Sequence, residues 1–599
     1  MKTAQIAIID FGSQYTHLIT RRIRQLGVLA RIFPPNVLIS DLRFAKGLIL
    51  SGGPKSVHDQ TAIKYNKKIF DLRVPILGLC YGHQLIAQHF GGQVKPGKTK
   101  EYGFANLEIV KPSRLLAGVK NRKIWMSHGD SVWQLPQDFE ATAKTFDCRV
   151  AAMENVKKNI YGLQFHPEVA HTASGLKILE NFVFKICQAK KDWSLELYWR
   201  QIIAEVKKAV GRRNVFLLVS GGVDSAVCFA LLEKVLGKKR VFGLHIDNGL
   251  MRLNESKKVI SALADSGFED LYLNDASVVF LKALSGAVDP EEKRKIIGRT
   301  FLKIKDQVMA ELKLNPKNWV LGQGTIYPDT IETGGTKHAD KIKTHHNRVK
   351  EVLKLMALGA LVEPLASLYK DEVRLIGKKL GLPNSLLERH PFPGPGLAIR
   401  ILCSSGHENI KTLKQENKLK KIVAPELKTQ ILSIRSVGVQ GDNRTYRQPA
   451  LIQGKASWQK LHDLSVRITN ELHQINRVVY LVGPAKVNLK KLKLKSAYIT
   501  KDRLDLLRQV DDLVTQEIKS QKIYDKIWQF PVVLAPLSLK GGEAVILRPV
   551  ESREAMTVNF YQMNESILNK LAKKILKIPG IDLVLYDITN KPPGTIEWE

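Results

Sequence analysis

Short apolar segments that end in glycine- or serine-rich turns recur along the chain, and they constrain its fold more than any other feature. The first 190 residues contain four of them, IAIIDFGSQ, LILSGGP, PILGLCYGHQ and YGLQFHPEV. Runs that are apolar at every position are typical of strands buried on both faces of a parallel sheet. The pattern therefore predicts an α/β fold with functional loops at the strand ends.

A second series of such segments begins near Trp193. Strands are predicted at 214–219, 241–246 and 319–323. The loops after the first two read SGGVDS and DNGL, and ligands of open α/β sheets bind beyond the carboxyl ends of the strands. We therefore expect two doubly wound α/β domains, at 1–192 and 193–395, each with its own site.

The remaining block, residues 396–599, contains a weak internal repeat. The segments INRVVYLVG and IDLVLYDIT both alternate β-branched residues, and each follows a stretch with helical periodicity. A strand-like segment precedes each helix, TYRQPALIQG in the first copy and EAVILRPVES in the second. We expect an α+β substrate-binding or dimerisation domain with two β-α-β subdomains, at about 430–500 and about 525–599. Coincidental β-rich patterning is the alternative.

The net charge of the chain limits the classes of molecule that it is expected to bind. The 93 Lys and Arg residues exceed the 57 Asp and Glu residues, which gives a formal net charge of +36. Most of the excess is lysine along helix-like stretches without interleaved aromatic residues, so a nucleic-acid surface is disfavoured. An anionic small substrate is equally compatible with the charge.

The cysteines and the N-terminal segment indicate the cellular compartment in which the protein is expected. The five cysteines are scattered, with no CxxC pair and no metal-ligand spacing, so a disulfide framework is not expected. No run of eighteen apolar residues is present, and the opening MKTAQIAIIDFGSQ lacks the long apolar segment of a signal peptide. We expect a cytoplasmic protein with no membrane partner.

One cysteine lies in a sequence typical of a nucleophile. GLCYG places Cys80 on a tight turn between the predicted strand PILGL and the helix-like HQLIAQHFGG, the geometry of a nucleophile elbow. A helix N-terminus beside the sulfur favours the thiolate, and its backbone N–H groups can hold an oxyanion. A buried, inert cysteine is the alternative, and the presence of a base decides between the two.

The segment QFHPEV offers that base. His166 and Glu168 lie at i and i+2, so an extended backbone points both side chains to one face. The imidazole can deprotonate the thiol while the carboxylate orients the imidazole, which is the logic of a catalytic triad.

These motifs, with SGGP at 51–54 and MSHGD at 126–130, resemble the class I glutamine amidotransferases. The resemblance implies that Cys80 attacks the side-chain amide of glutamine, forms a glutamyl thioester and releases ammonia. It also implies that the backbone at Gly53 and Tyr81 holds the oxyanion.

The loop SGGVDS suits phosphate, because it offers consecutive backbone N–H groups and two hydroxyls at a helix N-terminus. It has no lysine, so it is not a Walker A loop, and a plain strand-to-helix turn is the alternative. The loop resembles the pyrophosphate-binding signature of the N-type ATP pyrophosphatases, which cleave ATP between its α and β phosphates. That resemblance implies ATP binding by Ser220, Gly221, Gly222, Val223, Asp224, Ser225 and, after the next strand, Asp247. The Asp224 carboxylate can join Mg²⁺ that bridges the phosphates.

Three longer stretches indicate which molecule accepts the ammonia. They are IYPDTIET, IKTHHN with its continuation to RHPFPGPGLAIR, and the tail NKPPGTIEWE. With the motifs above, they resemble the glutamine-hydrolysing GMP synthetase family over essentially the whole chain. The resemblance implies that MgATP adenylates XMP with release of pyrophosphate, and that ammonia from glutamine then gives GMP and AMP.

The same resemblance implies particular contacts. XMP would be held by Arg294, Asp442, Gln529, Lys591 and Glu597. Lys343 would belong to a mobile lid over the adenylation site. The chain departs from many bacterial members in reading RVKEVLKL after IKTHHN and in its longer last block. The lid and the expected homodimer therefore need not follow the bacterial pattern.

Two other functions fit parts of the sequence. A tRNA-thiolating ATP pyrophosphatase suits SGGVDS and the positive charge, but it needs paired sulfur-relay cysteines, and Cys228 stands alone in an apolar helix. A basic binding protein on a degenerate enzyme scaffold conflicts with the intact Cys80, His166 and Glu168.

Overall fold

The computed structural model describes the chain except for short gaps and one longer interval. The described residues are 4–13, 15–57, 63–169, 171–313, 317–327, 329, 359–406, 413–440, 443–551, 558–591 and 593–599. They divide into two compact units. Unit 1 comprises Met1–Lys208, Thr325–Leu353 and Pro364–Glu372, and unit 2 comprises Ala209–Gly324, Lys354–Glu363 and Val373–Glu599.

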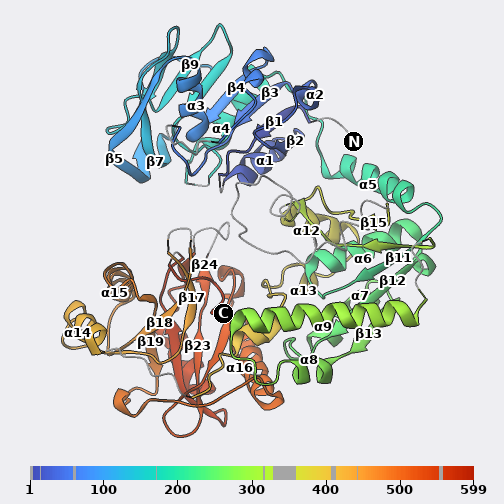
Figure 1. Cartoon of the computed structure of the whole chain (residues 1–599), viewed down its shortest axis with the longest axis vertical. Coiled ribbons are helices and arrows are strands. Elements are labelled where there is room, and N and C mark those ends of the chain that lie inside the picture. The colour runs from blue at the N-terminus through green and yellow to red at the C-terminus, as the bar shows by residue number, and fades with distance from the viewer. Residues whose placement is uncertain are drawn as a thin grey trace. The chain divides into compact units, whose positions relative to one another are not determined.

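Unit 1 is built on an eight-stranded mixed sheet (Figure 1). In sheet order its strands are β2 (Ala30–Phe33), β1 (Ile6–Ile9), β3 (Gly47–Leu50), β4 (Ile76–Leu79), β10 (Ile160–Leu163), β9 (Ala152–Asn155), β8 (Glu140–Lys144) and β6 (Glu108–Ile109). The first five are parallel and the last three join antiparallel. The helices are α1 (Thr16–Gln25), α2 (Ile39–Leu42), α3 (Tyr81–His89), α4 (Gly175–Glu180) and, for the most part, α5 (Leu195–Val210). Two long strands, β5 (Gln93–Asn106) and β7 (Lys123–Gln134), form a separate hairpin sheet.

The central strands of this sheet are covered on both faces. Ile6 and Ile8 of β1 belong to one apolar cluster, whereas Ala7 and Ile9 belong to another. Because successive side chains of a strand point to opposite faces, a strand between two cores needs an apolar residue at every position. That requirement explains the uninterrupted apolar runs of the sequence.

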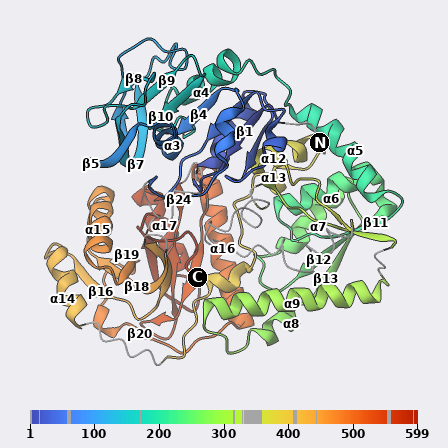
Figure 2. The same cartoon turned by 45° about the horizontal axis from the view of Figure 1, so that its top comes forward.

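Unit 2 contains two sheets. The first has five parallel strands, in the order β13 (Leu271–Asp275), β12 (Val241–Asp247), β11 (Asn214–Leu218), β14 (Trp319–Gly322) and β15 (Leu361–Val362). Figure 2 shows β11 and β12 near α6 and α7. The helices that accompany this sheet are α6 (Val223–Leu236), α7 (Glu255–Asp265), α8 (Ser277–Ala283), α9 (Pro290–Glu311), α12 (Lys370–Lys379) and α13 (Asn384–Leu387). The three strands predicted here agree with β11, β12 and β14 to within one residue at each end.

The second sheet of unit 2 has seven strands. Six lie in the order β16 (Lys428–Ile431), β18 (Asn443–Gln453), β19 (Ile475–Gly483), β26 (Ile581–Asp587), β23 (Glu543–Leu547) and β21 (Val532–Ala535), and β17 (Ser436–Gln440) pairs with β18. The helices of this part are α14 (Leu413–Ile422), α15 (Trp458–Glu471), α16 (Lys501–Ser520) and α17 (Glu565–Ile575). Short strand pairs join β20 (Lys493–Leu494) to β22 (Leu537–Ser538) and β24 (Val550–Glu551) to β25 (Asn559–Phe560).

Two β-α-β connections meet at the centre of this sheet. Strands β18 and β19 are parallel and flank α15 in the sequence, and the parallel β23 and β26 flank α17 in the same way. The two connections join antiparallel, with Tyr480 of β19 opposite Tyr586 of β26. The protein therefore has several parallel and mixed sheets, which confirms a multidomain α/β chain. Across the residues that the structure describes, no helix is long and apolar enough to cross a membrane.

Candidate active sites

Strand order brings the predicted nucleophile and base together. Strands β4 and β10 are parallel neighbours, with Leu79 opposite Leu163 in the register. Cys80 follows the first strand and QFHPE follows the second, so both motifs leave the sheet at the same edge. This adjacency could not be read from the sequence, because the two strands lie far apart along the chain.

Cys80 lies at the elbow that the sequence predicts. It caps the N-terminus of α3 with φ = 50°, a value that few residues other than glycine adopt, and its side chain is mostly buried. The flanking glycines are needed for packing, since a methyl group at Gly82 would collide with the carbonyl oxygen of Leu50. Strain at a cysteine between a strand and a helix is typical of a catalytic nucleophile.

His166 and Glu168 form a buried pair. Nδ1 of His166 lies 2.7 Å from Oε1 of Glu168, and the two side chains are 4% and 0% exposed. Burial alone lowers the pKa of His166, but the Glu168 carboxylate, together with the hydrogen bond and negative charge of the Cys80 sulfur, outweighs it and raises that pKa to about 10. The imidazole is therefore protonated at neutral pH, a state that stabilises a thiolate next to it.

The predicted oxyanion groups adjoin one another. A methyl group at Gly53 would lie 2.6 Å from the carbonyl oxygen of Phe11 and 3.3 Å from Cγ of Tyr81, so only glycine fits there. Tyr81 is the first residue of α3. The backbone N–H of Tyr81 thus follows Cys80 directly at the positive end of a helix, and Gly53 lies against the ring of Tyr81.

Some neighbours of the sulfur were not singled out from the sequence. Sγ of Cys80 lies 3.5 Å from the carbonyl oxygen of Ser127 and 3.8 Å from Nε2 of Gln164, and the ring of Tyr15 meets that of His166 edge-on at 4.9 Å. Gln164 stands in QFHPEV two residues before the histidine, and that position was its only signal.

SGGVDS forms a compact turn at the carboxyl end of β11. Gly221 has φ = 78°, and Gly222 caps α6. The hydroxyl oxygens of Ser220 and Ser225 lie 3.1 Å apart, and Ser220 Oγ accepts from the backbone N–H of Gly222 at 3.3 Å. The loop therefore gathers two hydroxyls and a helix N-terminus at one point, a setting that suits phosphate.

Two carboxylates accompany this loop. Asp224 lies in the first turn of α6, and Asp247 ends the neighbouring parallel strand β12, where its Oδ1 accepts from the N–H of Gly249 at 2.9 Å. Carboxylate and hydroxyl oxygens are the hard donors that Mg²⁺ prefers, so Asp224 with the serines of the loop fits the implied ion.

Two residues predicted to hold XMP contact each other at the C-terminal tail, whereas two others contact different groups of unit 2. Nε2 of Gln529 donates to Oε1 of Glu597 at 2.8 Å. Nη2 of Arg294, on α9, donates to the main-chain oxygen of Glu599 at 2.6 Å, so its contact is with the tail. The backbone N–H of Lys591 donates to Val558 at 2.8 Å. Asp442 and Lys343 lie outside the described residues.

Comparison with known proteins decides between the functions left open. Residues 7–186 match the glutamine amidotransferase class-I family, and residues 516–598 match the GMP synthase C terminal domain. A probable glutamine-hydrolysing GMP synthase of Leptospira interrogans is 44% identical over 607 residues, covering 99% of each chain. The chain belongs to the glutamine-hydrolysing GMP synthases.

Two other curated relatives support the same assignment. The GMP synthases of Chlorobium chlorochromatii and Brachyspira hyodysenteriae are 42% and 37% identical over 612 and 608 residues, each covering 99% of both chains. Among solved structures, a glutamine amidotransferase from Thermotoga maritima is 17% identical, covers 32% of this chain and 100% of that one, and has a TM-score of 0.27. The activity of this family of ligases is the glutamine-dependent amination of XMP to GMP, and the resemblance inferred from the motifs is confirmed.

Buried cations around the tail of this GMP synthase were missed at the sequence level. Arg477 and Arg548 both pair with Asp587, at 2.8 and 2.9 Å, and both also donate to tail carbonyl groups. Nζ of Lys293 donates to Oε2 of Glu599 at 2.6 Å. In the sequence these residues look like ordinary members of a large basic excess.

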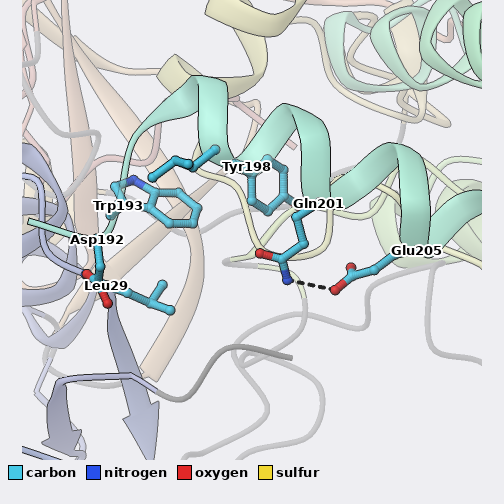
Figure 3. Close-up of a pocket in the computed structure, with 7 residues that line it drawn as sticks. Leu29, Asp192, Trp193, Tyr198, Gln201 and Glu205 are labelled. Atoms are coloured by element: carbon cyan, nitrogen blue, oxygen red, sulfur yellow. Dashed lines mark hydrogen bonds between the residues drawn. The ribbon is translucent and has the colours of Figure 1, made fainter.

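A cavity of about 340 Å³ in unit 1 contains none of the predicted site residues (Figure 3). It is lined by Leu29, Asp192, Trp193, Leu197, Tyr198, Gln201 and Glu205. Three of its polar side chains are already engaged, since Asp192 Oδ1 accepts from the N–H of Leu29 at 2.8 Å and Gln201 Nε2 donates to Glu205 at 2.7 Å. The predicted site residues therefore lie outside the lining of this cavity.

Proposed function

We propose that Cys80, His166 and Glu168 generate the ammonia for GMP synthesis. The observation that carries this proposal is the buried His166–Glu168 pair beside a cysteine at a strained elbow. The thiolate of Cys80 attacks the amide carbon of glutamine, and the backbone N–H groups of Gly53 and Tyr81 hold the resulting oxyanion.

Proton transfer completes this half-reaction. The imidazolium of His166 gives its proton to the departing nitrogen, which leaves as ammonia, and a glutamyl thioester remains on Cys80. His166 then takes a proton from the water that hydrolyses the thioester to glutamate. Glu168 keeps the ring oriented and stabilises its charged form.

We assign adenylation of XMP to the loop in unit 2. Ser220, Gly221, Gly222, Val223 and Ser225 would cradle the phosphates of ATP that leave as pyrophosphate, with Asp247 near the adenosine. Bound Mg²⁺ would neutralise phosphate charge, and Asp224 would hold it. Lys343 would add positive charge from a lid.

XMP would lie at the C-terminal tail. Arg294 and Lys591 suit its phosphate, whereas Asp442, Gln529 and Glu597 suit ribose or base edges. The contact between Gln529 and Glu597 supports a shared site for these two. Ammonia would displace AMP from the adenylated base to give GMP.

Several coarser expectations complete the proposal. We retain the division into 1–192, 193–395 and 396–599, with the last block as two β-α-β subdomains at about 430–500 and about 525–599. Antiparallel pairing of β19 with β26 is compatible with that repeat. A cytoplasmic homodimer without nucleic-acid partners is the expected state.

Product analysis tests the reaction. The purified protein with MgATP and glutamine should form GMP, AMP and pyrophosphate in equal amounts, and only when XMP is present. AMP formation that depends on added RNA and not on XMP would contradict the proposal and favour tRNA modification.

A further inference from the structure

Arg400 is a completely buried cation whose partner is a predicted XMP contact. It ends the 3-10 turn formed by Gly396–Arg400, and its side chain is 0% exposed. Its Nε donates to Oε2 of Glu597 at 3.0 Å, and its Nη2 donates to Oε1 at 2.8 Å. A bidentate fork of this kind fixes the plane of a carboxylate, which a single donor does not do.

The hydrogen bonds to Glu597 leave its Oε2 able to accept one more hydrogen bond. A carboxylate oxygen can accept about two hydrogen bonds. Oε1 of Glu597 accepts from Arg400 and from Gln529, whereas Oε2 accepts from Arg400. Among the described contacts, one acceptor position therefore remains at Oε2, on a side chain that is 17% exposed.

Arg400 is itself held from the opposite side. Its Nη1 lies 3.9 Å from Oδ1 of Asp511 on α16, and Oδ2 of Asp511 lies 3.4 Å from Nε of Arg252. The ring of Phe392 lies 5.2 Å from the guanidinium carbon of Arg400. The guanidinium is thus enclosed by groups of unit 2 and has little freedom to turn.

We propose that Arg400 is a positioning residue of the acceptor site, which orients Glu597 so that Oε2 accepts one ring N–H of the purine base of XMP. An ionised carboxylate can only accept hydrogen bonds, so the pair selects a base edge that presents N–H over one that presents a lone pair. The inference rests on the proposed function, in which Glu597 contacts XMP.

The substitution Arg400→Lys tests the fork, because it keeps the charge and removes the bidentate geometry. Loss of a well-placed hydrogen bond to a charged group should raise KM for XMP by about tenfold or more. KM for ATP and kcat/KM for glutamine hydrolysis should each change by less than about twofold.

The chain offers a matched control in Arg503→Lys. Arg503 makes a similar fork with Glu543 in the same unit, with Nε 2.9 Å from Oε1 and Nη2 2.6 Å from Oε2, and both side chains are nearly buried. This variant should lower the melting temperature about as much as Arg400→Lys does, with KM for XMP unchanged. An equal rise in KM for XMP would show a general effect of lost stability and would overturn the inference.

A double-mutant cycle with Glu597→Gln distinguishes the positioning role of Arg400 from the proposed contact of Glu597 with XMP. If Arg400 acts through Glu597, Arg400→Lys should change KM for XMP by less than about twofold in the Glu597→Gln background. An undiminished effect there would overturn the positioning role and leave the proposed XMP site intact. Glu597→Gln with an unchanged KM for XMP would overturn both.

The unaltered protein provides a test that does not depend on a variant folding. XMP analogues methylated at a single ring nitrogen remove one N–H each. One of them should bind at least about tenfold more weakly than XMP, in line with a lost hydrogen bond to a charged group. Equal binding of every such analogue would overturn the inference.

Discussion

At the residue scale, two buried histidines of unit 1 show how strongly a neighbouring charged group changes the pKa of an imidazole. His83 and His166 are both almost completely buried. Burial lowers the pKa of His83 to about 3, helped by the nearby His128. At His166 the Glu168 carboxylate and the Cys80 sulfur overcome burial and raise the pKa to about 10. His83 stands closer to Cys80 in the sequence, but only His166 has an acid two residues away, and this spacing made it predictable.

Glu168→Gln should remove most of the glutaminase activity. Without the carboxylate, the largest contribution that opposes burial at His166 is gone, so its pKa falls and the imidazolium that stabilises the thiolate is disfavoured. We expect kcat/KM for glutamine to fall by about a hundred- to ten-thousand-fold. GMP synthesis from XMP, MgATP and added ammonium should continue at the rate of the unaltered protein. A glutaminase rate within a few-fold of normal would remove Glu168 from the triad.

The same pair predicts a pH dependence of stability. The pKa of His166 is raised from its ordinary value of 6.5 to about 10 in the fold, so its ion pair stabilises the protein fully below pH 6.5 and less as the pH rises toward 10. The melting temperature of unit 1 should therefore exceed that of Glu168→Gln most near pH 6.5, and the two should converge toward pH 10. A difference that grows with pH would contradict the shift.

At the scale of elements, the C-terminal tail is tied to helix α9. Nζ of Lys293 donates to Oε2 of Glu599 at 2.6 Å and to the carbonyl oxygen of Ile401 at 2.9 Å, and both side chains are buried. The next residue, Arg294, holds the main-chain oxygen of Glu599. The tail is thus held against helix α9 within unit 2.

Glu599→Gln should destabilise unit 2 strongly. It leaves the Lys293 ammonium buried without a counter-charge, which typically costs about 3–5 kcal/mol. The double substitution Lys293→Met with Glu599→Met removes both charges and should recover most of the loss, because an apolar pair can replace a buried ion pair. Denaturant unfolding followed by a unit 2 signal measures both, and equal stability of the single and double variants would contradict the account.

Some elements of the fold could be predicted from the sequence, whereas the contacts between distant elements could not. The strands β11, β12 and β14 were predictable because their apolar runs are short and end in turn residues. The partners of the tail were not, since Arg400 and Glu597 lie 197 positions apart and pair only once the fold is formed. A buried arginine carries no local signal that separates it from the many exposed basic residues of this chain.

At the scale of the whole molecule, two chemistries share one chain. The residues proposed for glutamine hydrolysis belong to unit 1, and the SGGVDS loop with the tail belongs to unit 2. Family membership was predictable because separate motifs pointed to a single reaction. The position of the nucleophile beside its base followed from strand order, which the sequence did not reveal. Lys343 and Asp442 lie outside the described residues, so their roles stay predictions.

The central claim is that unit 1 supplies only the ammonia, and the substitution Cys80→Ala tests it most directly. Glutamine-dependent GMP synthesis should fall by about a thousandfold or more, while synthesis from added ammonium should stay within about twofold of normal. Cys187→Ala, at another buried cysteine of unit 1, should retain both activities. Loss of both activities in folded Cys80→Ala, or retention of the glutamine-dependent one, would contradict the account.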